Sequence, residues 1–169
     1  MNFLAWLEQT DFSVWLRESD WGHPIVLCFH AVGMGLVVGI SFMFCARVLG
    51  YSRKIPLDAF DRLFHLAWFG FWMNAVSGVV LFSGSPRRLL ETPAFVIKMV
   101  LIAAAGFSLW LLARTLQGVM KPAGASARLS ELEAMPAGAR VAAAFTVLFW
   151  IGTIVAGRLI AYTIGPPPI

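Results

Sequence analysis

Five polar side chains in or beside long apolar stretches are the residues of this chain best able to do chemistry: His23, His30, His65, Lys98 and Arg158. A neutral imidazole binds transition metals through a ring nitrogen. Lysine and arginine neutralise bound anions, and a deprotonated lysine can itself act as a metal ligand. These residue types predict a cofactor or metal site, provided that the elements around them bring them to one place.

The composition shows what kind of elements those must be. Of the 169 residues, 59% are hydrophobic and 13% are charged, and the mean hydropathy is +0.78. Soluble domains carry about 25% charged residues, so this chain lacks the polar material to cover a water-facing surface. It is predicted to be a membrane protein with at most four or five spans and no room for a separate catalytic domain.

Four apolar stretches predict four membrane-spanning helices, over about 24–48, 59–82, 94–116 and 140–163. Each is long enough to cross about 30 Å of hydrocarbon as a helix. We therefore predict an all-α, four-helix transmembrane domain over residues 22–165. Turn-rich connections are expected at 50–56, 83–93 and 118–138, with one short helical piece at 130–134.

The first 21 residues differ from the rest because apolar and charged side chains alternate along them. This pattern is typical of an amphipathic helix that lies in the plane of the membrane interface. Trp6, Trp15 and Trp21 suit the aromatic belt at the same level.

The distribution of Lys and Arg predicts the orientation. The connections after the first and third spans carry eight of them, against three on the opposite side. By the positive-inside rule, both termini lie outside, which in a bacterial inner membrane is the periplasm. Because these bases lie mostly at span ends, the sequence pI of about 9.6 does not indicate nucleic-acid binding.

Counting residues from the middle of each span predicts which side chains share a depth. His30, Lys98 and Arg158 each fall about 10 Å to the outer side of the membrane centre. His65 falls about 9 Å to the inner side, almost 20 Å below His30. One metal ion in one chain is therefore not expected to bind both His30 and His65.

Structural roles remain open for each of these side chains. Lys98 and Arg158 could extend to the outer headgroups, and His30 and His65 could form hydrogen bonds within a packed bundle. His23, just before Pro24, could close the start of its helix.

The faces of the first two spans add detail. His23, His30 and Met34 project from one side of the first span, whereas Gly35 and Gly39 form a G-x-x-x-G pattern that predicts a close helix approach on roughly the opposite side.

In the second span, Asn74, Ser77 and Gly78 share a face that predicts hydrogen bonding between helices. Cys28 and Cys45 are 17 residues apart in one helix, a separation of about 25 Å that excludes a disulfide between them.

Apart from Asp61, near the start of the second span, the predicted spans contain no Asp or Glu. Proton relays and cation pathways usually need carboxylates inside the membrane. Proton-coupled pumps and cation transporters are therefore disfavoured.

The first span begins its motif at His30-Ala-Val-Gly and is followed by Arg47-Val-Leu-Gly50, and the third span opens with Phe95-Val-Ile-Lys98. These features resemble the four-helix HemJ-type protoporphyrinogen oxidases and the copper resistance D membrane family. The resemblance implies b-type haem at a first-span histidine and a third-span lysine, which are His30 and Lys98 here. The chain departs from the HemJ-type pattern at Val96 and Ile97, where a histidine usually stands beside the lysine.

The first functional hypothesis is a membrane protein that binds haem b and exchanges electrons near the periplasmic face with quinol or a partner subunit. His30 would be an axial ligand, and Lys98 and Arg158 would offset the propionates. Lys98 or Met99 could supply the sixth ligand. His65 could belong to a second, inner site.

Two other hypotheses stay open. A copper-handling protein would use His30 with Met34, His23 as an entry ligand and Met99 opposite. A cofactor-free subunit would anchor a larger membrane complex. A homodimer, finally, could bring His30 or His65 of two copies to equal depth.

Overall fold

The computed structural model describes residues 3–51, 59–116 and 135–163. The chain forms α1 (Phe3–Glu8), α2 (Asp11–Glu18), α3 (Gly22–Leu49), α4 (Ala59–Gly84), α5 (Pro86–Glu91), α6 (Pro93–Leu116) and α8 (Ala137–Thr163). In this described part there are only helices and no strands. The predicted helical piece at 130–134 and the predicted end of the domain at 164–165 lie outside these residues.

Four of the helices, α3, α4, α6 and α8, are long and apolar enough to cross a membrane. Their bounds agree with the four predicted spans to within three residues at each end. At most 28% of the most apolar window of each helix is buried inside the protein, as expected where lipid covers the remainder. The chain is a multi-pass, all-α membrane protein with a four-helix bundle.

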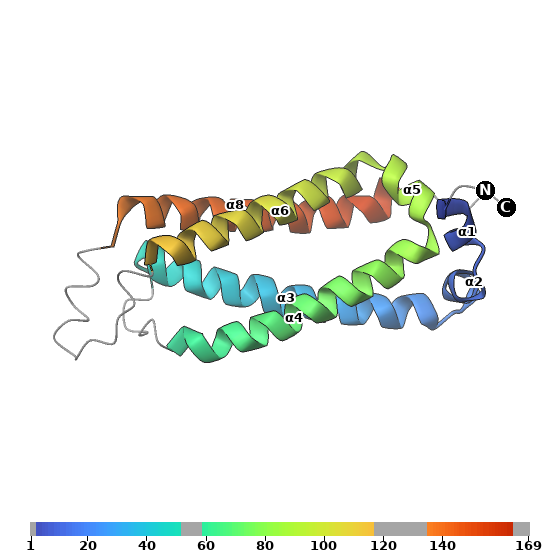
Figure 1. Cartoon of the computed structure of the whole chain (residues 1–169), viewed down its shortest axis with the longest axis horizontal. Coiled ribbons are helices and arrows are strands. Elements are labelled where there is room, and N and C mark those ends of the chain that lie inside the picture. Colours follow the sequence, from blue (N-terminus) through green and yellow to red (C-terminus); the bar gives the residue numbers. More distant parts are fainter. Residues whose placement is uncertain (1–2, 52–58, 117–134, 164–169) are drawn as a thin grey trace.

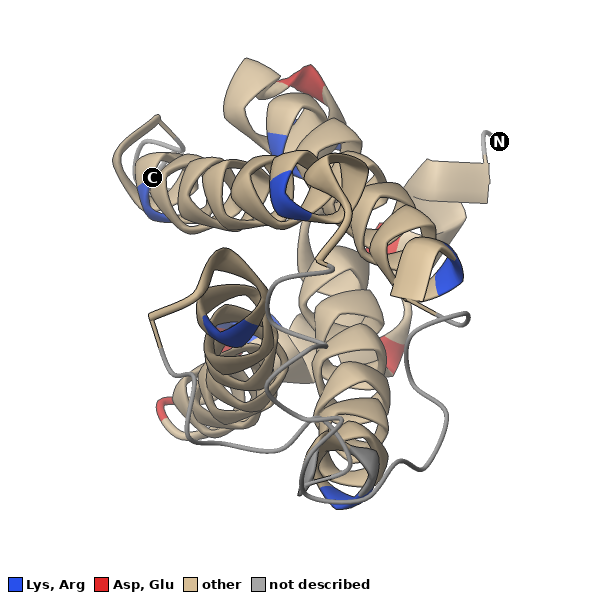
Figure 2. Cartoon of the chain, turned by 90° about the vertical axis from the view of Figure 1, so that its left-hand side faces the viewer, with Lys and Arg blue, Asp and Glu red and all other residues tan. Residues whose placement is uncertain are grey.

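The four helices form two layers. One layer pairs α3 with α4 and the other pairs α6 with α8, and contacts between α3 and α8 join them. Figure 1 shows the two layers one above the other, and the end view in Figure 2 shows the same separation. A side chain that points from α3 toward α6 therefore crosses from one layer to the other.

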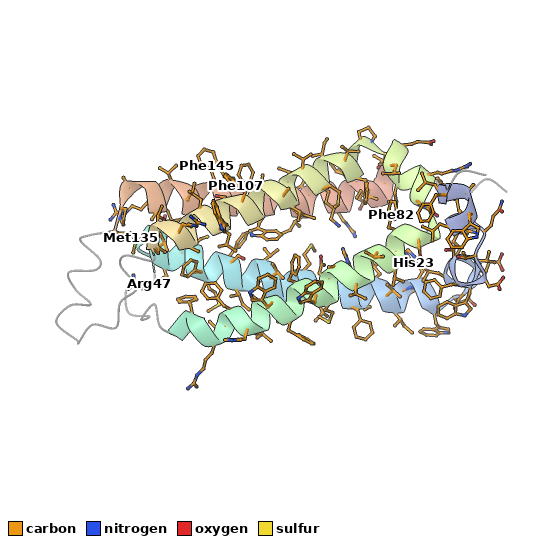
Figure 3. All side chains as sticks on the ribbon, viewed as in Figure 1. His23, Arg47, Phe82, Phe107, Met135 and Phe145 are labelled. Carbon is orange, nitrogen blue, oxygen red and sulfur yellow. The ribbon has the colours of Figure 1, made fainter. Side chains whose placement is uncertain are left out.

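The bundle has two distinct ends. The end that carries α1, α2 and α5 is called here the α1 end, and the opposite end is called the Met135 end (Figure 1). Figure 3 places His23 toward the α1 end and Arg47 and Met135 at the other. At the Met135 end all four long helices meet in a buried cluster that includes Phe44, Phe60 and Leu112.

Helix α3 ends at a glycine for a conformational reason. Gly50 has a φ of 95°, in the left-handed region that other residues rarely adopt. Its backbone N–H donates to the carbonyl of Arg47 at 3.1 Å. This is a common way to end a helix.

The close approach within the first layer occurs at glycines other than the predicted pair. A Cβ added at Gly33 would lie 2.7 Å from the backbone nitrogen of Asn74, and one added at Gly70 would lie 2.7 Å from Cβ of Leu36. At Gly35 and Gly39 an added Cβ would meet nothing within 4 Å. The prediction from the G-x-x-x-G pattern was therefore wrong, because α4 packs on another face of α3.

The N-terminal segment forms two short helices instead of one, separated at Thr10. The hydroxyl of Thr10 accepts a hydrogen bond from the backbone N–H of Ser13, which caps the start of α2. Leu16 is fully buried, and Arg17 donates to the carbonyl of Gly84 at 2.7 Å. These contacts hold α2 against the end of α4.

Two smaller expectations can also be compared with the structure. The connection between the second and third spans was predicted to be turn-rich, but six of its residues form α5, which begins at Pro86. Proline suits a first helical position because its missing N–H would have no partner there. Cys28 and Cys45 are free, as predicted.

Candidate functional site

The imidazole of His30 is held in the seam between helices by two groups of α4. Its Nδ1 lies 3.0 Å from the carbonyl oxygen of Asn74 and 3.1 Å from Oγ of Ser77. A carbonyl can only accept a hydrogen bond, so Nδ1 carries a proton and donates it. When the ring is neutral, Nε2 is therefore the nitrogen with the free lone pair.

The side chain of Asn74 makes the reciprocal contact. Its Nδ2 donates to the backbone carbonyl of His30 at 2.7 Å. The hydroxyl of Ser77 donates to the carbonyl of Met73 at 2.6 Å, and so its oxygen remains free to accept from His30. The predicted hydrogen bonding between helices by Asn74 and Ser77 is confirmed, and its partner is His30.

Lys98 reaches His30 from the other layer. Its Nζ lies 3.4 Å from Nε2 of His30, within range of a long hydrogen bond. An ammonium is a donor only, so a protonated Lys98 donates to the lone pair of Nε2. The contact confirms that His30 and Lys98 share a depth, as the residue count predicted.

Two glycines lie against this pair. A Cβ added at Gly78 would lie 3.2 Å from Cε1 of His30. A Cβ added at Gly157 would lie 3.7 Å from Nζ of Lys98. Gly78 was predicted only as part of a packing face and Gly157 not at all, although Gly157 stands directly before Arg158 in the sequence.

His30, Asn74, Ser77 and Lys98 are called here the polar cluster. The spans Gly22–Leu49, Arg62–Gly84, Pro93–Leu116 and Ala137–Thr163 contain no Asp or Glu, so a protonated Lys98 brings a positive charge without a carboxylate from these spans. The cluster can bind a metal through Nε2 if Lys98 yields that position, share a proton between two nitrogen atoms, or attract an anion.

Arg158 points away from the polar cluster. It is exposed, and its guanidinium lies over the ring of Tyr162, 5.6 Å from the ring centroid. Gly157, the neighbour of Arg158, lies beside Lys98, so the backbone of Arg158 is at the predicted depth. The side chain of Arg158, however, lies along the outside of α8. Depth alone therefore did not place Arg158 in the site.

The two candidate methionines have other surroundings. Met99 is 50% exposed. Met34 packs against the buried cluster of Val38, Ala105 and Trp150.

The remaining histidines are both exposed. His23 lies in the first turn of α3, about 10 Å along the helix axis from His30. His65 lies nine residues along α4 from Asn74, about 13 Å at 1.5 Å per residue. This separation agrees with the expectation that His30 and His65 do not bind one ion within a single chain.

No group of three or more His, Cys, Asp or Glu residues that could hold a metal ion occurs within the part of the chain that the structure describes. The donor set at the polar cluster is instead one imidazole and one amine. Compared with known protein families, with curated proteins and with solved structures, the chain matches none.

Proposed function

We propose that this chain binds b-type haem through His30 and handles electrons near the periplasmic face of a bacterial inner membrane, with both termini periplasmic. The observation that carries the proposal is the fixed orientation of the His30 ring. Metal-binding histidines usually donate their second ring N–H to a carbonyl or a similar acceptor, which fixes the tautomer. Asn74 and Ser77 supply this contact to Nδ1.

The residues present fit a haem iron in their donor chemistry. Nε2 of His30 and Nζ of Lys98 face each other from opposite layers at 3.4 Å. A deprotonated Lys98 would be a second nitrogen ligand, while a protonated Lys98 would offset a propionate.

Bound haem would supply one-electron chemistry. The protein would hold the haem in position and shield it. His30 would bind the iron, Asn74 and Ser77 would hold its ring, and Gly78 leaves space at Cε1. Arg158 has less support as a propionate partner, because its guanidinium lies over Tyr162.

Copper handling has less support than haem. It would require thioether ligands beside His30, whereas Met34 packs into a cluster and Met99 is half exposed. The following experiment also tests the third hypothesis, a cofactor-free anchor subunit.

The experiment is an absorption spectrum of the full chain, purified in detergent from haem-replete cells, in oxidised and reduced forms. We expect a Soret band that is lost in His30→Ala and retained in His65→Ala and His23→Ala, since the latter two histidines are exposed and distant. Lys98→Met should shift the band, and Arg158→Met should leave it in place. A colourless, folded chain that co-purifies with large subunits would overturn the proposal in favour of an anchor role.

A further inference from the structure

Three side chains of α6, called here the α6 ladder, form a continuous stack on the surface of the second layer. The rings of Phe107 and Trp110 are stacked with centroids 5.6 Å apart, and the guanidinium carbon of Arg114 lies over the ring of Trp110 at 4.5 Å. Phe107 and Trp110 are 64% and 49% exposed, and Arg114 is also exposed. Because α6 is long and apolar enough to cross a membrane, the α6 ladder faces lipid.

The order of the α6 ladder along the helix follows the depth profile of a phospholipid. With the midpoint of α6 at the bilayer centre, Phe107 lies about 4 Å, Trp110 about 8 Å and Arg114 about 14 Å toward the Met135 end. The hydrocarbon of a bilayer extends about 15 Å from its centre. The two rings are therefore at the depth of acyl chains, and the guanidinium is at the level where the headgroups begin.

The charge of Arg114 defines which headgroup it can attract. Neither α6 nor α8 contains Asp or Glu, so these helices supply no carboxylate to neutralise it. Cation–π attraction to the ring of Trp110 orients the guanidinium and leaves N–H donors for an acceptor. The planar guanidinium suits two oxygen atoms of one phosphate group. The chemistry at this end of the α6 ladder is therefore complementary to an anionic phosphate.

The other arginine–aromatic pair of the second layer has the opposite order. On α8, Arg158 lies over the ring of Tyr162 at 5.6 Å, and Tyr162 is the nearer of the two to the helix end. Its charge is therefore deeper in the membrane than its ring. The α6 ladder instead places its charge at the surface and its rings below, as an amphipathic lipid requires.

We propose that the α6 ladder binds one anionic phospholipid, with Arg114 on the phosphate and an acyl chain along Trp110 and Phe107. A zwitterionic phospholipid offers the same chains, but its ammonium group lies near the phosphate and weakens the attraction to a guanidinium. Lys98 stands 16 residues before Arg114, about 24 Å along α6. The proposal therefore goes beyond the proposed function and does not depend on haem.

Native mass spectrometry of the full chain in detergent tests the proposal, with dioleoyl phosphatidylglycerol and dioleoyl phosphatidylcholine added in turn. The two lipids have the same acyl chains, and only the first has a net negative charge. We expect tighter binding of phosphatidylglycerol. Arg114→Gln should weaken that binding about fivefold, the effect of one basic residue at an anionic lipid surface.

Arg140→Gln is the matched control for the charge. Arg140 is exposed and lies about 15 Å from the midpoint of α8, at the same end of the bundle. Among the described residues, the cation–π contacts involve Arg114 and Arg158 and not Arg140. Arg140→Gln should therefore leave the binding of phosphatidylglycerol close to that of the parent chain.

A second pair of variants tests the rings. Trp110→Leu should weaken phosphatidylglycerol binding about threefold, because it removes the ring that orients Arg114. Trp68→Leu is its control, since Trp68 is 61% exposed on α4 and its ring contacts Phe71 instead of an arginine. All four substituted side chains are exposed, so each variant should unfold at the same denaturant concentration as the parent chain.

Two results would overturn the proposal. Equal binding of the two lipids would show that the α6 ladder does not select an anionic headgroup. Equal losses in Arg114→Gln and Arg140→Gln would show that positive charge at the Met135 end attracts these lipids without a defined site.

Discussion

The two ends of the bundle use their buried volume in different ways. At the Met135 end, all four spanning helices meet in an apolar cluster in which Phe44 makes edge-on contacts with Phe60 and Phe64, at ring centroid distances of 5.3 and 5.1 Å. Toward the α1 end, the space between helices holds His30, Asn74 and Lys98. The comparison indicates that packing at the Met135 end stabilises the bundle, while the polar cluster is where we propose that haem binds.

The largest loss of stability is expected from Phe44→Ala. Phe44 is 1% exposed and lies at the centre of the apolar cluster. Removing its ring should lower the free energy of unfolding by about 3–5 kcal/mol, the cost of a large cavity. Unfolding in mixed detergent measures this effect, and a Soret band that disappears while the chain remains folded would contradict the division between the two ends.

Gly33→Ala should give the next largest effect. The added Cβ would lie 2.7 Å from the backbone nitrogen of Asn74, so α3 and α4 would have to separate. We expect a loss of about 1–3 kcal/mol in the free energy of unfolding. Because the shift moves Asn74 relative to His30, weaker haem binding should accompany it. Stability and haem affinity both unchanged would show that this crossing does not position the site.

Asn74→Leu tests the contribution of the Asn74 amide to haem binding with little change in packing. It removes the amide that donates to the carbonyl of His30 at 2.7 Å and keeps a side chain of similar size. Loss of a group that orients a metal ligand typically costs 10- to 100-fold in affinity. Haem titration of the purified variant measures the loss, and an affinity equal to that of the parent chain would mean that the backbone of α4 alone holds the ring.

Gly35→Ala should have the smallest effect. An added Cβ would meet nothing within 4 Å, and alanine is favoured over glycine in a helix by about 1 kcal/mol. We expect stability equal to or slightly above that of the parent chain in the same unfolding assay. A loss as large as that of Gly33→Ala would indicate that another chain packs on this face of α3.

The predictions from sequence succeeded where length and depth decide the outcome, and failed for Arg158 and for Gly35 and Gly39, where the rotation of a helix decides it. His30 and Lys98 meet as the residue count predicted. Arg158, predicted at the same depth, instead lies over Tyr162. Gly35 and Gly39 formed the motif, but Gly33 makes the contact.

The amino-acid sequence by itself determined the four spans, because a helix that crosses about 30 Å of hydrocarbon needs about 20 apolar residues. It also determined the level of each polar residue along its helix, because the rise per residue is constant. The tertiary structure alone decided which faces meet. Lipid and the interior of the bundle are both apolar, so hydropathy does not distinguish them, and only close packing at Gly33 and Gly70 turns His30 toward Asn74 and Lys98.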